Sequence, residues 1–207
     1  MNIAVFASGR GSNFQAILNS IRQGSLPARV TVLVSNKADA GAFEIARVQN
    51  IPAVQINQTM FSSEDVFAQK ILDVLRGHQT DLIALAGYLK RIPSRVVHEF
   101  RNRIVNVHPA LLPAFGGAGM YGHHVHEAVL AYGAKISGAT VHIVDEEYDH
   151  GPIVMQKAIE VADGETPESL AAKVLVIEHE LYPTALKAFA EKRIRIEGNR
   201  VWVTSSH

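Results

Sequence analysis

Short runs of apolar residues alternate along the chain with segments whose apolar residues recur at helical spacing. Five runs have the length of a strand and are bounded by Gly, Asn or Pro; they cover residues 3–7, 30–34, 53–56, 82–86 and 104–107. Continuous apolar runs are typical of strands buried on both faces of a parallel sheet. Helices are predicted between them, from about residue 12, over residues 40–49, after a cap at residues 62–65 and over residues 94–100. This alternation predicts an α/β fold with a doubly wound, mostly parallel sheet.

The pattern changes after the fifth run. Residues 109–122 are rich in Gly and Pro, and a long irregular segment inside a compact domain is usually functional or disordered. A short helix is predicted around residues 126–132, followed by two strands at 137–144 and 153–161 that can pair as a hairpin. A long helix is then expected from the cap at residue 166 to about residue 187. Two short strands around Gly198-Asn199 predict a C-terminal hairpin.

Composition narrows the class of protein. The 207 residues include 47% apolar and 19% charged residues, which is typical of a globular chain, and we expect one domain over residues 1–207. Twenty basic residues balance twenty acidic ones, which argues against nucleic-acid binding and against a polybasic membrane surface. The chain has no cysteine, so it has no disulfide and no thiolate metal site. No apolar run is long enough to span a membrane, and residues 1–7 resemble a strand more than a signal peptide.

The residues that follow the predicted strands are candidates for binding, because ligands of an open α/β sheet bind at the carboxyl ends of its strands. After the first strand, Gly9, Gly11, Ser12 and Asn13 lead directly into a helix. Glycine lets the backbone approach a ligand, and the N–H groups of a helix N-terminus attract phosphate. A phosphate site is predicted here; the alternative is a tight turn in which Ser12 or Asn13 caps the helix. NAD binding is not expected, because Phe14 occupies the third glycine position of the dinucleotide motif.

Later strand ends carry a second group of candidates. Lys90 and Arg91 follow the fourth strand, where a cation pair can hold an anion, although the sequence alone favours a solvated helix start. Asn106 and His108 close the fifth strand, and residues two apart in a strand point to the same side. An amide donor beside an imidazole can stabilise an oxyanion and move a proton, as acyl transfer requires. The alternative is a buried histidine bonded to a carbonyl.

Three further polar clusters have open interpretations. Four acids lie within residues 145–149; a solvated turn is the default, and an acid held near His108 would raise the pKa of that imidazole. The sequence does not say which acid would reach it. The histidines at 123, 124 and 126 are too closely spaced for a usual zinc site, and no metal is expected. Glu178 and His179 are expected on the surface of the last helix.

Seven short motifs occur in order along nearly the whole chain. They are Gly11-Ser12-Asn13, Ser35-Asn36-Lys37-Ala38-Asp39, Leu85-Ala86-Gly87-Tyr88, Asn106-x-His108-Pro109-x-Leu111-Leu112-Pro113, Ser137-Gly138-x-Thr140-Val141-His142, Asp149-x-Gly151-Pro152 and Glu178-His179-x-Leu181-Tyr182-Pro183. In this combination they resemble the phosphoribosylglycinamide formyltransferase family of folate-dependent formyltransferases. The resemblance implies a Rossmann-like formyltransferase fold. It also implies transfer of the formyl group of 10-formyltetrahydrofolate, as co-substrate, to the amine of 5′-phosphoribosylglycinamide in purine biosynthesis.

The resemblance also implies roles for individual residues. Asn106 and His108 would stabilise the tetrahedral oxyanion, and Asp149 would pair with His108, keep it cationic and assist proton transfer. Gly11, Ser12 and Asn13 would hold the substrate phosphate, and Glu178 its ribose. The residues expected at the folate are Leu89, Lys90, Arg91, Ile92, Asn106, Asp145 and Asp149. The implied organisation is a phosphate-binding half to about residue 100, a folate and catalytic half to about residue 190, and the hairpin over residues 191–205.

Two departures from the family pattern and several alternatives accompany this interpretation. The loop over residues 113–124 is longer and richer in glycine than in shorter members of the family. Glu64 lies where some members have a basic residue that binds the folate tail, so Lys90 or Arg91 would anchor that tail here. A different formyl acceptor or a formyltetrahydrofolate hydrolase is the alternative within the family, although we expect no room here for their usual extra domains. A non-catalytic sensor of phosphorylated metabolites is the alternative of another class. We expect a cytoplasmic monomer or homodimer with small-molecule substrates.

Overall fold

The computed structural model describes residues 1–205, which form two compact units, Met1–Val105 and a second that starts at Asn106. The elements of the first unit are β1 (Asn2–Phe6), α1 (Ser12–Arg22), β2 (Arg29–Ser35), α2 (Ala42–Val48), β3 (Ala53–Gln55), the 3-10 turn η1 (Gln58–Met60), α3 (Glu64–Gly77), β4 (Leu82–Leu85) and α4 (Ser94–Glu99). The turn η1 is the one of these that the apolar pattern does not predict, because three residues are too few to carry a period.

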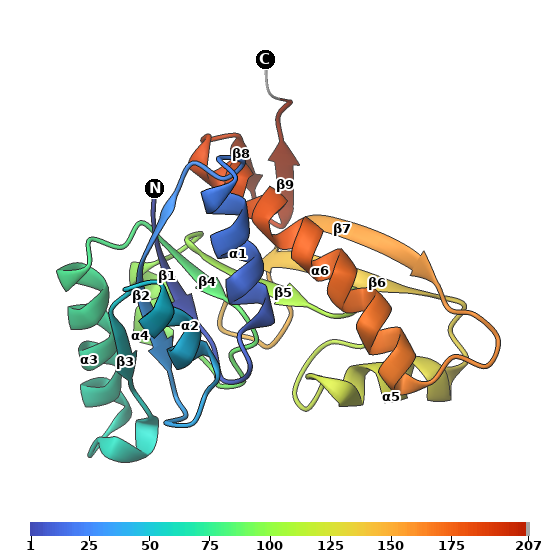
Figure 1. Cartoon of the computed structure of the whole chain (residues 1–207), viewed down its shortest axis with the longest axis horizontal. Coiled ribbons are helices and arrows are strands. Elements are labelled where there is room, and N and C mark those ends of the chain that lie inside the picture. The colour runs from blue at the N-terminus through green and yellow to red at the C-terminus, as the bar shows by residue number, and fades with distance from the viewer. Residues whose placement is uncertain (206–207) are drawn as a thin grey trace. The chain divides into compact units, whose positions relative to one another are not determined.

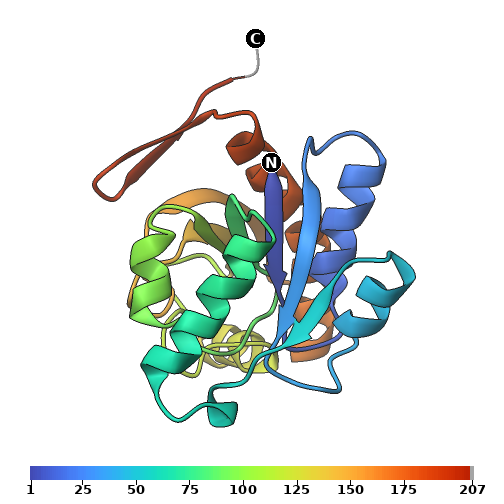
Figure 2. The same cartoon turned by 90° about the vertical axis from the view of Figure 1, so that its left-hand side faces the viewer.

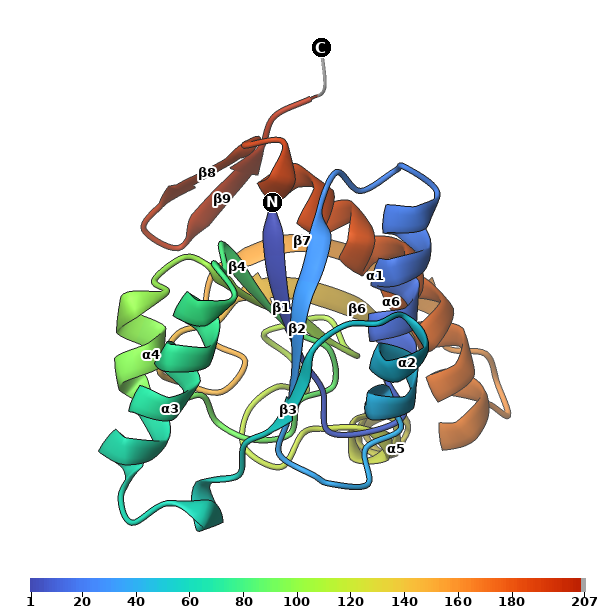
Figure 3. The same ribbon diagram turned by 60° about the vertical axis from the view of Figure 1, so that its left-hand side comes forward.

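The first unit is a parallel sheet with helices on both faces. Its strands lie in the order β3-β2-β1-β4, and β1 pairs in parallel with both β2 and β4. Helices α1 and α2 cover one face, and α3 and α4 cover the other (Figures 2 and 3). The side chains of residues 3–7 are fully buried between the two helical layers, which explains why β1 is a continuous apolar run. The predicted doubly wound α/β arrangement is confirmed.

The second unit begins within β5 (Ile104–His108), the strand on which the unit boundary falls. It continues with α5 (His123–Tyr132), β6 (Ile136–Ile143), β7 (Ile153–Glu160), α6 (Pro167–Ala190), β8 (Ile194–Glu197) and β9 (Arg200–Val203). Strands β6 and β7 pair antiparallel, and the long helix α6 packs against both of them and against α5 (Figure 1). The predicted C-terminal hairpin is confirmed as the antiparallel pair β8–β9.

Helix ends follow the predicted caps in two cases and depart from them in two. Ser63 caps α3 and Thr166 caps α6, each by accepting a backbone N–H with its side chain. Helix α5 begins at His123, three residues earlier than predicted, because Gly122 with φ 56° ends the irregular loop there. At α1 the N-cap is Gly11, and no side chain caps the first turn, so the predicted alternative of a Ser12 or Asn13 cap is wrong.

No helix in the described part of the chain has both the length and the apolar character needed to cross a membrane. The single-domain organisation expected from the sequence stays a prediction.

Candidate functional site

The loop after β1 presents the N-terminus of α1 without a side-chain cap. Gly11 has φ 82° and ψ 25°, a left-handed conformation that glycine adopts without strain. A Cβ on Gly11 would lie 3.1 Å from the Cα of Ala42, so the backbones of the loop and of α2 also approach closely. Ser12 is half-buried and Asn13 is buried in the first turn of the helix. This is the arrangement that an anion at a helix N-terminus requires.

Ser8 joins three strand-end loops of the first unit. Its hydroxyl donates to Oδ1 of Asn36 at 2.5 Å and accepts the Leu89 N–H at 2.9 Å. The loops after β1, β2 and β4 are therefore tied together by one buried side chain. The sequence did not reveal that Ser8 and Asn36 contact each other, because their strands become neighbours only in the folded sheet.

The segment after β4 has no regular structure before α4 begins. Leu89, Lys90 and Arg91 are exposed, and Ile92 is buried. The predicted solvated helix start is wrong in detail, because Lys90 and Arg91 precede the helix and lie in the loop. An exposed cation pair next to a strand end remains compatible with anion binding.

The end of β5 brings Asn106 and His108 to polar partners within the second unit. Asn106 is half-buried, and its Nδ2 lies 3.1 Å from Nε2 of His142. His108 is 3% exposed; its Nε2 lies 2.8 Å from the Phe115 carbonyl oxygen, and its Nδ1 lies 3.5 Å from Oδ2 of Asp149. Because a carbonyl only accepts, Nε2 of His108 carries a proton. Its Nδ1 therefore faces the carboxylate as the site of the second proton.

Asp149 is the acid that reaches His108, and it is the one that the family resemblance named where the residue pattern alone left four acids open. Its backbone has φ 54°, and its Oδ2 accepts the Gly117 N–H at 3.0 Å. Its Oδ1 lies 3.5 Å from Nε2 of His142. The carboxylate therefore lies between two imidazoles and is oriented by the glycine-rich loop.

His142 completes the cluster and was missed as a site residue. It is 2% exposed, and its Nδ1 lies 3.0 Å from the Ile143 carbonyl oxygen, which assigns a proton to Nδ1. The Nε2 of His142 faces both the Asn106 amide at 3.1 Å and the Asp149 carboxylate at 3.5 Å. The signal in the sequence was a histidine near the end of the strand that the pattern predicted over residues 137–144.

Burial and neighbouring charges set the protonation of the cluster. Burial lowers the pKa of His108 below its ordinary value, although the Asp149 carboxylate and the Phe115 carbonyl raise it. Burial is the largest of these effects, so their balance favours the neutral imidazole in the ligand-free protein, and the cationic His108 implied for the reaction stays a prediction. Burial raises the pKa of Asp149, but His142, the charge on a protonated His108 and the Gly117 N–H outweigh it and hold the pKa below its ordinary value.

The remaining predicted residues lie apart from these contacts. Asp145 accepts the Glu147 N–H at 2.9 Å and pairs with Nδ1 of His150 at 2.9 Å, which folds the exposed loop between β6 and β7. Glu178 lies on α6 and is 8% exposed, so the predicted surface position is wrong and the carboxyl group is a buried one.

The histidines at the start of α5 divide into two kinds. His123 and His124 are exposed and pair with Glu127, and His123 also pairs with Glu168 at 3.3 Å. His126 is buried, and burial lowers its pKa to about 4. Within residues 1–205 no group of three or more His, Cys, Asp or Glu is arranged to hold a metal ion.

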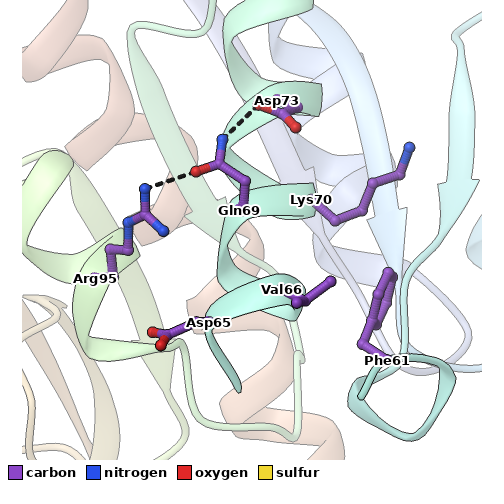
Figure 4. A pocket seen from close by; sticks show the side chains of 7 residues that line it. All are labelled: Phe61, Asp65, Val66, Gln69, Lys70, Asp73 and Arg95. Atoms are coloured by element: carbon purple, nitrogen blue, oxygen red, sulfur yellow. Dashed lines mark hydrogen bonds between the residues drawn. The ribbon is translucent and has the colours of Figure 1, made fainter. Parts of the chain in front are cut away.

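A shallow pocket of 410 Å³ lies on the first unit between η1, α3 and α4 (Figure 4). Gln69 links two of its charged side chains: Arg95 donates to Oε1 of Gln69 at 2.6 Å, and Nε2 of Gln69 donates to Asp73 at 2.7 Å. Phe61 and Val66 supply apolar walls. None of the predicted site residues lines this pocket, so it is not the candidate site.

Comparison with known proteins identifies the family. Residues 1–186 match the formyl transferase family. The chain is 47% identical over 194 residues to the chloroplastic phosphoribosylglycinamide formyltransferase of Arabidopsis thaliana, covering 93% of this chain and 66% of that protein. It is 39% identical to the phosphoribosylglycinamide formyltransferase of Bacillus subtilis, covering 89% of this chain and 92% of that one. The chain thus spans less than two thirds of the Arabidopsis protein and nearly all of the bacterial one.

A solved structure agrees in fold. Glycinamide ribonucleotide transformylase 1 of Symbiobacterium toebii superposes with a TM-score of 0.93 at 39% identity, covering 99% of this chain and 94% of that one. The predicted family resemblance is confirmed, and the chain belongs to the formyl transferase family.

Proposed function

We propose that this protein transfers the formyl group of 10-formyltetrahydrofolate to the amine of 5′-phosphoribosylglycinamide, a step of purine biosynthesis. The observation that carries the proposal is the buried cluster of Asn106, His108, His142 and Asp149 in the second unit. Relatives named phosphoribosylglycinamide formyltransferase support the choice of acceptor. The supporting contacts all join an amide, two imidazoles and one carboxylate, the groups that acyl transfer needs.

Asn106 and His108 stabilise the charge that develops when the amine attacks the formyl carbon. The formyl oxygen becomes an oxyanion, and an N–H of the Asn106 amide donates to it. A proton on Nδ1 of His108 would pair with Asp149 and add positive charge beside that oxygen. Because the pKa of His108 is lowered in the ligand-free protein, this proton is taken up as negative charge builds in the site.

Asp149 transfers a proton from the attacking amine to the leaving nitrogen of the folate. The attacking amine becomes cationic and must lose a proton, while the leaving nitrogen of the folate must gain one as its bond to the formyl carbon breaks. The lowered pKa keeps Asp149 ionised, so it accepts the proton through water and passes it on to the leaving nitrogen. Because the Asp149 carboxylate is a weak base, it releases the proton again to the leaving nitrogen.

The other predicted residues bind the ends of the two substrates. Gly11, Ser12 and Asn13 hold the phosphate at the N-terminus of α1, and Glu178 holds the ribose hydroxyls. The segment Leu89, Lys90, Arg91 and Ile92, together with Asp145, contacts the folate. The open helix N-terminus and the exposed cation pair support these assignments, and they explain how a chain of zero net charge can bind two anions.

The experiment is a rate measurement with absorbance of the released tetrahydrofolate, run with phosphoribosylglycinamide and without an acceptor. Turnover that depends on the acceptor is expected, and His108→Ala should abolish most of it. His78→Ala, at the C-terminal end of α3, is a matched control and should retain the rate. Equal turnover without an acceptor would instead identify a hydrolase, and ligand binding without turnover would identify a sensor.

A further inference from the structure

Two side chains of the β6–β7 pair hold the turn that follows the catalytic strand. Thr140 on β6 lies directly opposite Gln156 on β7 in the antiparallel register. The Thr140 hydroxyl donates to the Ala110 carbonyl at 2.6 Å and accepts the Leu112 N–H at 3.0 Å. Nε2 of Gln156 donates to Oγ1 of Thr140 and to the Leu112 carbonyl, both at 2.9 Å.

These bonds use the full capacity of the Thr140 hydroxyl. A hydroxyl has one hydrogen to donate and two lone pairs to accept with, and Ala110, Leu112 and Gln156 take all three. Thr140 is fully buried, so each lost partner would leave a polar group unsatisfied away from water. The Gln156 amide directs one hydrogen to Thr140 on β6 and the other to the Leu112 carbonyl in the turn. The arrangement therefore fixes the Ala110–Leu112 turn from two directions.

The fixed turn leads directly to the groups that orient the catalytic cluster. Three residues beyond Leu112, the Phe115 carbonyl accepts from His108, and two residues further the Gly117 N–H donates to Asp149. Gly116 lies between them, and a Cβ there would lie 2.5 Å from a Leu112 methyl group and 3.1 Å from the Cβ of Asp149. The turn, the loop and the Asp149 side chain are thus in close van der Waals contact.

We propose that Thr140 and Gln156 are positioning residues for formyl transfer, which act on His108 and Asp149 through the loop over residues 110–117. In this proposal the two side chains contact neither a substrate nor a reacting atom. They keep the Phe115 carbonyl and the Gly117 N–H in place. This inference rests on the proposed function for its kinetic consequence, but its structural consequence can be measured without any substrate.

The test uses two substitutions that remove the bonds and one that keeps them. Gln156→Leu removes both amide donors at an exposed position. Thr140→Val removes the buried hydroxyl with little change in shape, whereas Thr140→Ser retains it. Glu160→Gln, on the same face of β7, is the matched control. We expect kcat to fall about tenfold to a hundredfold in Gln156→Leu and Thr140→Val, with the KM for the acceptor within about twofold, because misplaced catalytic groups affect the reacting state most. Thr140→Ser and the control should stay within about threefold of the wild type.

A second readout is the titration of the His108 imidazole by NMR in the ligand-free protein. The Phe115 carbonyl raises the pKa of His108 against the effect of burial. Loosening the loop should therefore move this pKa further down in Gln156→Leu, and the amide of Leu112 should exchange its hydrogen faster. Unchanged titration, exchange and kcat in a folded Gln156→Leu protein would overturn the inference. If the titration changes in Gln156→Leu while the wild-type protein transfers no formyl group, the proposed function alone is overturned.

Discussion

Replacing His126 by leucine should remove a defined part of the acid sensitivity of the fold. His126 is 4% exposed on α5, and its Nδ1 has no hydrogen-bond partner among the described residues. Leucine is similar in volume and leaves no buried polar nitrogen unsatisfied. At pH 7 we expect the free energy of unfolding of His126→Leu to lie within about 1 kcal/mol of the wild type.

The magnitude follows from the difference in pKa between the folded and unfolded states. Burial, followed by the nearby charges of His123 and His108, lowers the pKa of His126 to about 4 in the folded protein. An unfolded histidine has a pKa of about 6.5. As the pH falls through that value the unfolded state takes up a proton that the folded state refuses, so stability is lost down to about the folded pKa. Between pH 7 and pH 5 a folded pKa of about 4 corresponds to a loss of about 2 kcal/mol from this side chain.

The assay is urea unfolding at pH 7, 6 and 5, with wild type and variant measured side by side. His126→Leu should be more stable relative to wild type at pH 5 than at pH 7 by about 2 kcal/mol. Val129→Ala, another buried change on the same helix, should lower stability by the same amount at each pH because it removes no titrating group. A parallel loss of stability in wild type and His126→Leu would refute the reasoning and indicate that His126 is readily protonated in the folded state.

Three further predictions concern the catalytic cluster and the fold. His108→Ala and Asp149→Asn should each lower kcat at least about a hundredfold, as expected for proton-transfer and electrostatic groups, with near-native circular dichroism. Near-wild-type turnover in both variants would contradict the roles assigned to His108 and Asp149. Gly151→Ala places a Cβ 2.0 Å from the Ile143 carbonyl oxygen, so it should destabilise the β6–β7 junction by more than about 2 kcal/mol in a denaturant titration. Ser63→Ala removes the cap of α3 and should cost about 1 kcal/mol, seen as a lower Tm with unchanged kcat; a Tm equal to wild type would contradict the capping bond.

The apolar pattern predicted the fold because the parallel strands are buried on both faces. Continuous runs such as residues 3–7 report that burial directly, and Ser63 and Thr166 mark helix starts by local chemistry. The start of α5 was misplaced because it depends on the backbone conformation of Gly122, which composition does not reveal. Propensity and periodicity describe local structure well and describe irregular loops poorly.

The site was predictable at its strand ends and not across its loops. Asn106 and His108 share a strand, so their common side followed from spacing alone. The residue pattern alone left four acids open, and Asp149 was named among them only through the family resemblance; the contact itself depends on the folded loop over residues 145–150. The role of His142 required knowledge of which strand pairs with which. The lowered pKa of His108 could not be predicted either, because burial outweighs the nearby carboxylate and burial belongs to the tertiary structure.

The central claim is that this protein transfers a formyl group to an amine, and an isotopic label tests it most directly. The protein is incubated with formyl-labelled 10-formyltetrahydrofolate and phosphoribosylglycinamide, and the products are separated and analysed by mass spectrometry. We expect the label on the amine nitrogen of the acceptor, at a rate that Asp149→Asn lowers at least about a hundredfold. Label recovered as free formate, or label that remains on the folate while both ligands are bound, would contradict the account.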